Sequence, residues 1–330
     1  MRPIWLKLLM LITMVAALQA MVGLYYQRVW VSSEFRTIKY LRKLYGKKDG
    51  IFFFGDSVLR YTAPQDSDTS SIPEMLQQEL SDPVHSLDGG AFQMDMYASL
   101  MQTLAARGTR PKAVLVPINL RSFSISWDCY PAWQFEKPKL LLHSERSFLV
   151  RTFAKPLLVF KAIHLTPISS KEYWETPVLI AGKDVGSMKF VHDTYLVSPD
   201  PAEKRAWFLK LYYLYKLDAR HRKAAALQKL ADLLRREKIP AHFYVVPLDM
   251  ETGQAALKDE FTNQVRENIG VLRKVLAEQG HELHDFSALL PSSCFSYPAN
   301  VPDEHLNQEG RRRMAAALAP LLKGGTVDGP

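Results

Sequence analysis

The chain has 330 residues and a formal net charge of +8, which is enough length for one large α/β domain with insertions or for two small domains. Its basic residues are dispersed and follow no aromatic–basic repeat, which argues against a nucleic-acid-binding protein. Its two cysteines are too few for a disulfide scaffold or a thiolate metal site. We therefore expect neither a metal nor a cofactor.

The N-terminal segment contains an apolar run, Leu8 to Tyr25, without charged residues. With its flanks it is long enough to cross ~30 Å of hydrocarbon. We predict an uncleaved transmembrane anchor over residues 1–30, because the run continues past the small residues around Ala20, where a signal peptidase could cleave. A cleaved signal peptide is the alternative. The basic residues in 28–48, which follow the apolar run, favour a cytoplasmic location for the domain after the anchor. A short N-terminal tail before a large domain instead favours a location outside the cytoplasmic membrane.

Beyond the anchor, apolar residues at helical spacing from Glu34 to Tyr45 predict a stalk helix within residues 31–49. Short apolar runs then alternate with helical patterns. The predicted strands span 51–54, 84–87, 113–118, 241–246 and 282–286, and the main predicted helices 73–80, 94–107, 202–237, 259–279 and 308–322. This alternation predicts an α/β domain over 50–322 with a doubly wound parallel sheet.

Residues 121–201 interrupt the alternation and are rich in aromatic side chains. We interpret this segment as an insertion that packs over the site as a cap. Ordinary core packing is the alternative for most of its aromatic residues. The tail, 323–330, is expected to be disordered.

Polar residues follow the predicted strands. Ser57 comes after the first strand, Gly90 after the second and Asn119 after the third, while Asp303 and His305 precede the last helix. Because the carboxyl ends of parallel strands share one edge of the sheet, these blocks should converge there. Capping of the next helix is the alternative role for Ser57.

Acyl-transfer chemistry needs this combination of groups. A serine hydroxyl is a weak nucleophile and needs a base, for which His305 is the candidate. The imidazole needs an acceptor that fixes its tautomer, and Asp303 is the nearest candidate, with Asp285 as a rival. The oxyanion needs aimed donors, which the Ser57 N–H, the Gly90 N–H and the Asn119 amide could supply.

The sequences FFFGDSVLR, the Gly89-Gly90 block, the Asn119 block and DEHLNQEGRRRMA resemble, in order, the four blocks of the SGNH (GDSL-like) hydrolase superfamily. The resemblance implies a flavodoxin-like three-layer sheet and ester or acyl chemistry on Ser57. Two departures stand out. The acid lies two residues before His305 instead of three, as in the alginate acetyltransferases, and the third block reads PINLR instead of Gly-x-Asn-Asp.

The resemblance implies a single-pass protein of the inner (cytoplasmic) membrane with an extracytoplasmic, periplasmic catalytic domain. It would be a serine esterase or O-acyltransferase that acts on the acyl groups of a cell-envelope polysaccharide. The expected acyl group is acetyl. By analogy a membrane-bound O-acyltransferase would be a partner. A lysophospholipase or thioesterase is an alternative, with the aromatic insertion as a lipid-chain pocket. A non-catalytic scaffold that binds polysaccharide or the partner transferase is another.

The remaining histidines show no metal-ligand spacing except His281 and His284, whose rings should face opposite sides of a strand. Cys129 and Cys294 lie in loops expected at the same sheet edge, so we predict that they form a disulfide. Two unrelated small apolar residues are the alternative.

Overall fold

The computed structural model describes residues 2–25, 36–147, 168–297, 301–302 and 304–323. The chain divides into two compact units, one formed by 1–47, 99–109 and 135–167, the other by 48–98, 110–134 and 168–330. The predicted acid Asp303, the linker 26–35 and almost all of the tail lie outside the described residues.

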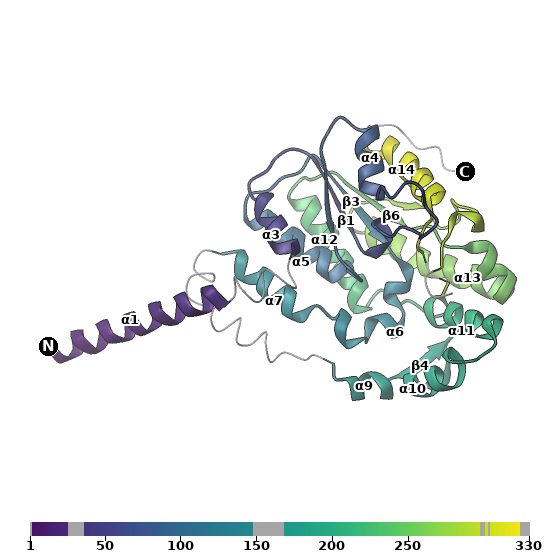
Figure 1. The fold of residues 1–330 in the computed structure, drawn as a ribbon, viewed down its shortest axis with the longest axis horizontal. Helices are drawn as coiled ribbons and strands as arrows, with labels where there is room; N and C mark the ends of the chain where they lie inside the picture. Colours follow the sequence, from purple (N-terminus) through teal and green to yellow (C-terminus); the bar gives the residue numbers. More distant parts are fainter. Residues whose placement is uncertain (1, 26–35, 148–167, 298–300, 303, 324–330) are drawn as a thin grey trace. The chain divides into compact units, whose positions relative to one another are not determined.

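The first unit contains the N-terminal helix α1, Arg2–Tyr25, at one end of the trace in Figure 1. Its segment Pro3–Val22 is long and apolar enough to cross a membrane, a property that a signal sequence shares. Helix α3, Arg36–Lys43, is shorter than predicted within the described residues and buries Ile38 and Leu41. It is tied to α7, Glu136–Glu145, by an ion pair of 2.7 Å from Arg42 to Glu145.

The second unit is built on a five-stranded sheet, visible at the centre of Figure 1. Its strands are β1 (Ile51–Gly55), β2 (Val84–Asp88), β3 (Ala113–Ile118), β6 (Ala241–Val245) and β7 (Leu283–Asp285). All pairs are parallel and the order is β2-β1-β3-β6-β7. Counted along the chain this is the order 2-1-3-4-5 of the flavodoxin-like folds, which switches direction between β1 and β3. The predicted α/β fold is thereby confirmed.

Strand β1 is buried on both sides, as its run of apolar residues predicts. On one side Phe54 stacks on Tyr97, with ring centroids 5.4 Å apart. On the other side Phe53 belongs to a core cluster with residues of α4 (Ile72–Glu79) and α14 (Gln308–Leu322). These two helices therefore cover one face. Right-handed crossovers place α12 (Arg222–Arg236) and α13 (Met250–Ala277) on the opposite face. Helix α5 spans Met94–Ala106.

Two predicted helices differ from those observed. The region 202–237 forms two helices, α11 (Pro201–Tyr213) and α12, because the connecting segment buries Leu214 and Leu217 and His221 caps the second helix. Helix α13 starts at Met250 instead of 259, since Asp249 caps it, and it is broken at Lys258, where φ is 55°.

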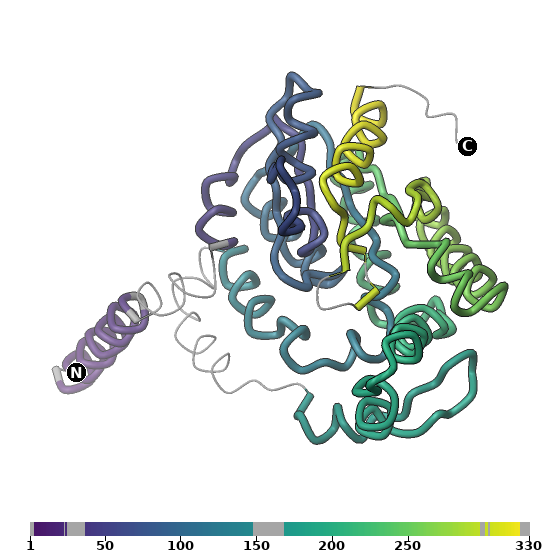
Figure 2. Tube along the Cα trace, turned by 45° about the vertical axis from the view of Figure 1, so that its right-hand side comes forward, coloured from purple at the N-terminus to yellow at the C-terminus, as the bar shows by residue number. Residues whose placement is uncertain are grey.

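The predicted insertion contains short elements. Within the second unit it forms the turn η3 (Leu120–Phe123), α6 (Ile125–Asp128), α9 (Ser170–Glu175), the hairpin β4–β5 (177–187) and α10 (Met188–Val191), drawn in teal in Figure 2. The hairpin region has its own apolar cluster, in which Tyr173 and Val178 are buried. For these residues the core-packing interpretation holds. The segment 148–167 lies outside the described residues, and the role of the insertion as a cap stays a prediction.

The predicted disulfide is wrong for this structure, because both cysteines are free thiols. Cys294 lies in the core cluster under α14, whereas Cys129 packs against the cluster of the hairpin region. The two side chains are thus anchored in different cores. Burial raises the pKa of both thiols, so neither is activated as a thiolate.

Candidate active site

The candidate nucleophile Ser57 stands at the carboxyl end of β1, where a tight turn leads into the short helix η2, Ser57–Leu59. The Leu59 side chain packs against Gly55, since a Cβ atom there would lie 2.1 Å from it. Asp56 caps the turn, and its Oδ1 accepts a hydrogen bond of 2.8 Å from the Val58 N–H. The local sequence thus places the serine hydroxyl at the edge of the sheet.

His305 reaches this hydroxyl from the other end of the chain. Its Nε2 lies 3.0 Å from Ser57 Oγ, the distance at which a neutral imidazole can accept the serine proton. The segment before α14 is fixed by a bridge between Phe295 and Leu306 and by a hydrogen bond of 2.8 Å from Ser296 N–H to His305 O. His305 as a whole is 9% exposed. One flank is covered by Tyr61, with ring centroids 4.5 Å apart.

Asn119 lies beside this pair and is held from both ends of its amide. Its Nδ2 donates a hydrogen bond of 3.1 Å to Asp56 Oδ2, and its Oδ1 accepts one of 3.0 Å from the Arg121 N–H. Burial raises the pKa of Asp56, opposed by the Val58 N–H and by the Arg121 charge. Asp56 therefore links the nucleophile turn to Asn119, whose amide nitrogen has a second hydrogen for an oxyanion.

The second glycine block lies next to the nucleophile turn, because the N–H of Gly89 donates to Gly55 O over 3.3 Å. Gly90 is exposed, and nothing lies within 4 Å of the position that a Cβ atom would take there. Gly90 is therefore accessible from solvent, and the oxyanion role of its N–H stays a prediction.

The predicted acids differ in what the structure describes. Asp303 lies outside the described residues. The rival Asp285 accepts a hydrogen bond of 2.6 Å from the Ser287 hydroxyl and lies 3.6 Å from Arg273. Those contacts engage Asp285, and the assignment of Asp303 to His305 stays a prediction.

Sequence reasoning missed three residues of the site: Tyr61, Arg121 and Glu304. Glu304 adjoins His305, and Arg121 stands two residues after Asn119. In the structure these two residues form an ion pair, but no sequence spacing predicts a contact between charged residues so far apart in the chain. Among the residues that the structure describes, no group of three or more His, Cys, Asp or Glu side chains is placed to hold a metal ion.

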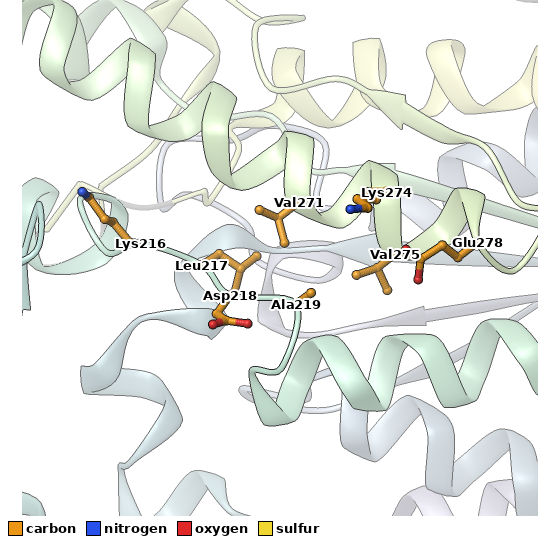
Figure 3. A pocket seen from close by; sticks show the side chains of 8 residues that line it. All are labelled: Lys216, Leu217, Asp218, Ala219, Val271, Lys274, Val275 and Glu278. Atoms are coloured by element: carbon orange, nitrogen blue, oxygen red, sulfur yellow. The ribbon is translucent and has the colours of Figure 1, made fainter.

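A pocket of about 470 Å³ lies elsewhere in the second unit, between segment 216–219 and α13. Figure 3 shows its lining, with Lys274 and Val275 contributed by α13 and Glu278 lying just after that helix. None of the candidate catalytic residues lines it. It is therefore a separate feature of the surface.

Comparison with known proteins gives matches among solved structures only. No protein-family model and no curated protein matches the chain. A carbohydrate acetylesterase from Sinorhizobium meliloti is 12% identical, with 84% of this chain and 99% of that chain covered and a TM-score of 0.37. A variant of an acetyl-xylooligosaccharide esterase from Geobacillus stearothermophilus is 11% identical, covering 87% and 100%, with a TM-score of 0.39. An extracellular lipase from Streptomyces rimosus is 13% identical, covering 84% and 100%, with a TM-score of 0.38. The chain is thus similar to esterases at low identity, and its function has to be argued from the site itself.

Proposed function

We propose that the protein is a serine esterase or O-acyltransferase of the SGNH type, with Ser57 as the nucleophile. The observation that carries the proposal is the distance of 3.0 Å between Ser57 Oγ and His305 Nε2, formed by residues from opposite ends of the chain. A nucleophile and a base within hydrogen-bond reach at a strand end are the arrangement that covalent acyl chemistry requires.

In the proposed reaction Ser57 Oγ attacks the acyl carbon while its proton passes to His305 Nε2. The tetrahedral oxyanion is stabilised by the Ser57 and Gly90 N–H groups and by the second amide hydrogen of Asn119. Collapse of this intermediate breaks the ester bond, and the leaving alcohol takes the proton from His305. Water then releases the acyl group as an acid, or an acceptor hydroxyl takes it as a new ester. Asp303 is assigned the orienting role on His305.

The proposed substrate is an acyl ester, with acetyl as the expected group, on a polysaccharide of the cell envelope. This assignment rests on the predicted membrane tether, the large insertion and the spacing of Asp303 and His305, which resemble those of envelope-modifying acyltransferases. It also rests on the apolar segment Pro3–Val22, which is long enough to anchor the chain in a membrane. A membrane-bound O-acyltransferase is the proposed partner, and an extracytoplasmic catalytic domain follows from that placement.

The test uses the full chain in mild detergent with p-nitrophenyl acetate as substrate and a fluorophosphonate as an active-site label. Ser57→Ala should abolish labelling, and both Ser57→Ala and His305→Ala should lower kcat on the order of 10³-fold or more. The double variant should be little worse than either single one, because the two residues act as a unit. Ser198→Ala, which removes two local hydrogen bonds, one to Glu203 and one from the Asp200 N–H, is the matched control.

The proposal fails if Ser57→Ala labels and turns over as well as the parent, because another residue would then be the nucleophile. A parent that shows neither labelling nor turnover would favour a scaffold without catalysis. Asp303→Asn and Asp285→Asn separate the two candidate acids, and only the first should impair turnover. Alkaline phosphatase fused after Leu322 should be active if the catalytic domain is extracytoplasmic. If a reporter that fluoresces only in the cytoplasm is fluorescent at the same position, the extracytoplasmic placement and the envelope substrate are both wrong.

A further inference from the structure

A buried ion pair lies beside the candidate catalytic residues. Arg121 Nη2 and Glu304 Oε2 are 2.9 Å apart, and the two side chains are only 4% and 0% exposed. The other carboxylate oxygen of Glu304 accepts a hydrogen bond of 2.5 Å from the Tyr213 hydroxyl. The Arg121 guanidinium also stacks over Trp127, 4.3 Å from the ring centroid. The two opposite charges are therefore neutralised against each other in a dry environment and held by α6 and α11.

Each member of the pair adjoins a candidate catalytic residue. The backbone N–H of Arg121 donates to Asn119 Oδ1 over 3.0 Å. Glu304 immediately precedes His305 in the chain. The ion pair thus connects the turn that orients the Asn119 amide with the segment that carries the histidine.

The location decides between a stabilising and a positioning role. A buried ion pair adds little net stability compared with apolar residues of similar volume, because both charges must leave water. It does fix the geometry of the segments that it joins. The segment of His305 contains no regular helix or strand at that residue, and residues 295 and 296 hold it through the Phe295–Leu306 bridge and the Ser296 N–H bond to His305 O. The Arg121–Glu304 pair supplies an anchor from the side of β3.

We propose that the Arg121–Glu304 ion pair is a positioning device that keeps His305 Nε2 within hydrogen-bond distance of Ser57 Oγ. This inference rests on the proposed esterase function. Both residues act through His305 and Asn119, and neither is assigned a proton transfer. Loss of the pair should therefore lower the rate of attack by Ser57 while leaving substrate binding nearly unchanged.

The test compares Glu304→Gln, Arg121→Gln and the double variant in the full chain in mild detergent. Glu304→Gln keeps the shape of the side chain and removes its charge. Because small misplacements of catalytic groups cost on the order of 10²-fold, each single variant should lower kcat by roughly 10- to 100-fold. KM should change less than about twofold, and the rate of fluorophosphonate labelling should fall in proportion to kcat. The double variant should be no worse than the poorer single one.

Two further variants keep the test decisive. Tyr213→Phe keeps the aromatic ring and removes the hydrogen bond to Glu304 Oε1. It should fold even if the charge variants do not, and it should lower kcat by a few-fold. Leu230→Ala is the control for stability: it leaves a cavity under α12, where the Leu230 side chain is fully buried. It is expected to lose about as much thermal stability as the charge variants. It should keep its kcat at temperatures where it is folded.

The proposal is overturned if Glu304→Gln and Tyr213→Phe fold and retain the parent kcat, or if their losses match that of Leu230→Ala at equal thermal stability. An effect confined to KM would also overturn it. These outcomes differ from a failure of the proposed function, in which the parent itself shows no turnover and no Ser57-dependent labelling.

Discussion

The most quantitative prediction concerns Lys223, a buried lysine in the first turn of α12. Its side chain is 1% exposed, and its Nζ donates a hydrogen bond of 2.8 Å to the carbonyl of Ser122 in the turn after Asn119. Asp128 lies 3.4 Å away and partly compensates the charge. Burial nevertheless lowers the pKa of Lys223 from 10.5 to about 8. The cation also lies at a helix N-terminus, where the helix dipole disfavours it.

The cost follows from linkage. One pKa unit corresponds to about 1.4 kcal/mol, so charging this amine in the folded state costs on the order of 3 kcal/mol relative to the unfolded chain. The folded protein binds fewer protons than the unfolded chain between about pH 8 and 10.5, so stability rises with pH across that window. Stability is lost as the pH falls through the folded pKa.

The perturbation is Lys223→Met, which keeps most of the side-chain volume and removes the titrating amine. Urea denaturation of both proteins from about pH 7 to pH 10 should show the parent gaining roughly 2–3 kcal/mol relative to the variant. At about pH 7 the variant should be at least as stable as the parent, because it avoids the buried charge, which costs on the order of 3 kcal/mol, but leaves the Ser122 carbonyl without its donor, which costs ~1–3 kcal/mol. Parallel pH profiles for the two proteins would refute the reasoning, since other groups titrate alike in both.

Three further outcomes are expected. Arg311→Met should cost ~3–5 kcal/mol in urea denaturation, because it leaves the carboxylate of Asp66, 4% exposed, without its partner at 2.7 Å; the exposed Arg312→Met should change little. Tyr61→Ala should lower kcat by about tenfold by freeing one flank of the His305 ring, whereas Tyr61→Phe should retain activity; equal losses would assign the role to the hydroxyl. Alkylation of the denatured protein without reductant should modify both cysteines, and protection of the pair would show a disulfide after all.

The sequence by itself determined the α/β class and the location of the candidate site. Strand β1 is a run of four apolar residues closed by Gly55-Asp56-Ser57, and a fully buried parallel strand needs that pattern whatever surrounds it. The predicted helix 308–322 has the bounds of α14, and in the structure Asn307 caps its start by accepting a hydrogen bond from the Gly310 N–H. Since parallel strands end at a common edge, residues after β1 and before α14 could be assigned to one site.

Only the tertiary structure decided the contacts that depend on two distant segments. These contacts join segments whose distance in space cannot be read from a local sequence pattern. They are the contact of His305 with Ser57, the hydrogen bond of Asn119 to Asp56 and the ion pair of Arg121 with Glu304. The cysteines illustrate the same limit. Sequence placed their loops at one edge, but Cys129 and Cys294 are held in different apolar clusters. Burial, which sets the pKa of Lys223 and Asp56, is likewise a property of the packed molecule, because a side chain loses its water only when other segments cover it.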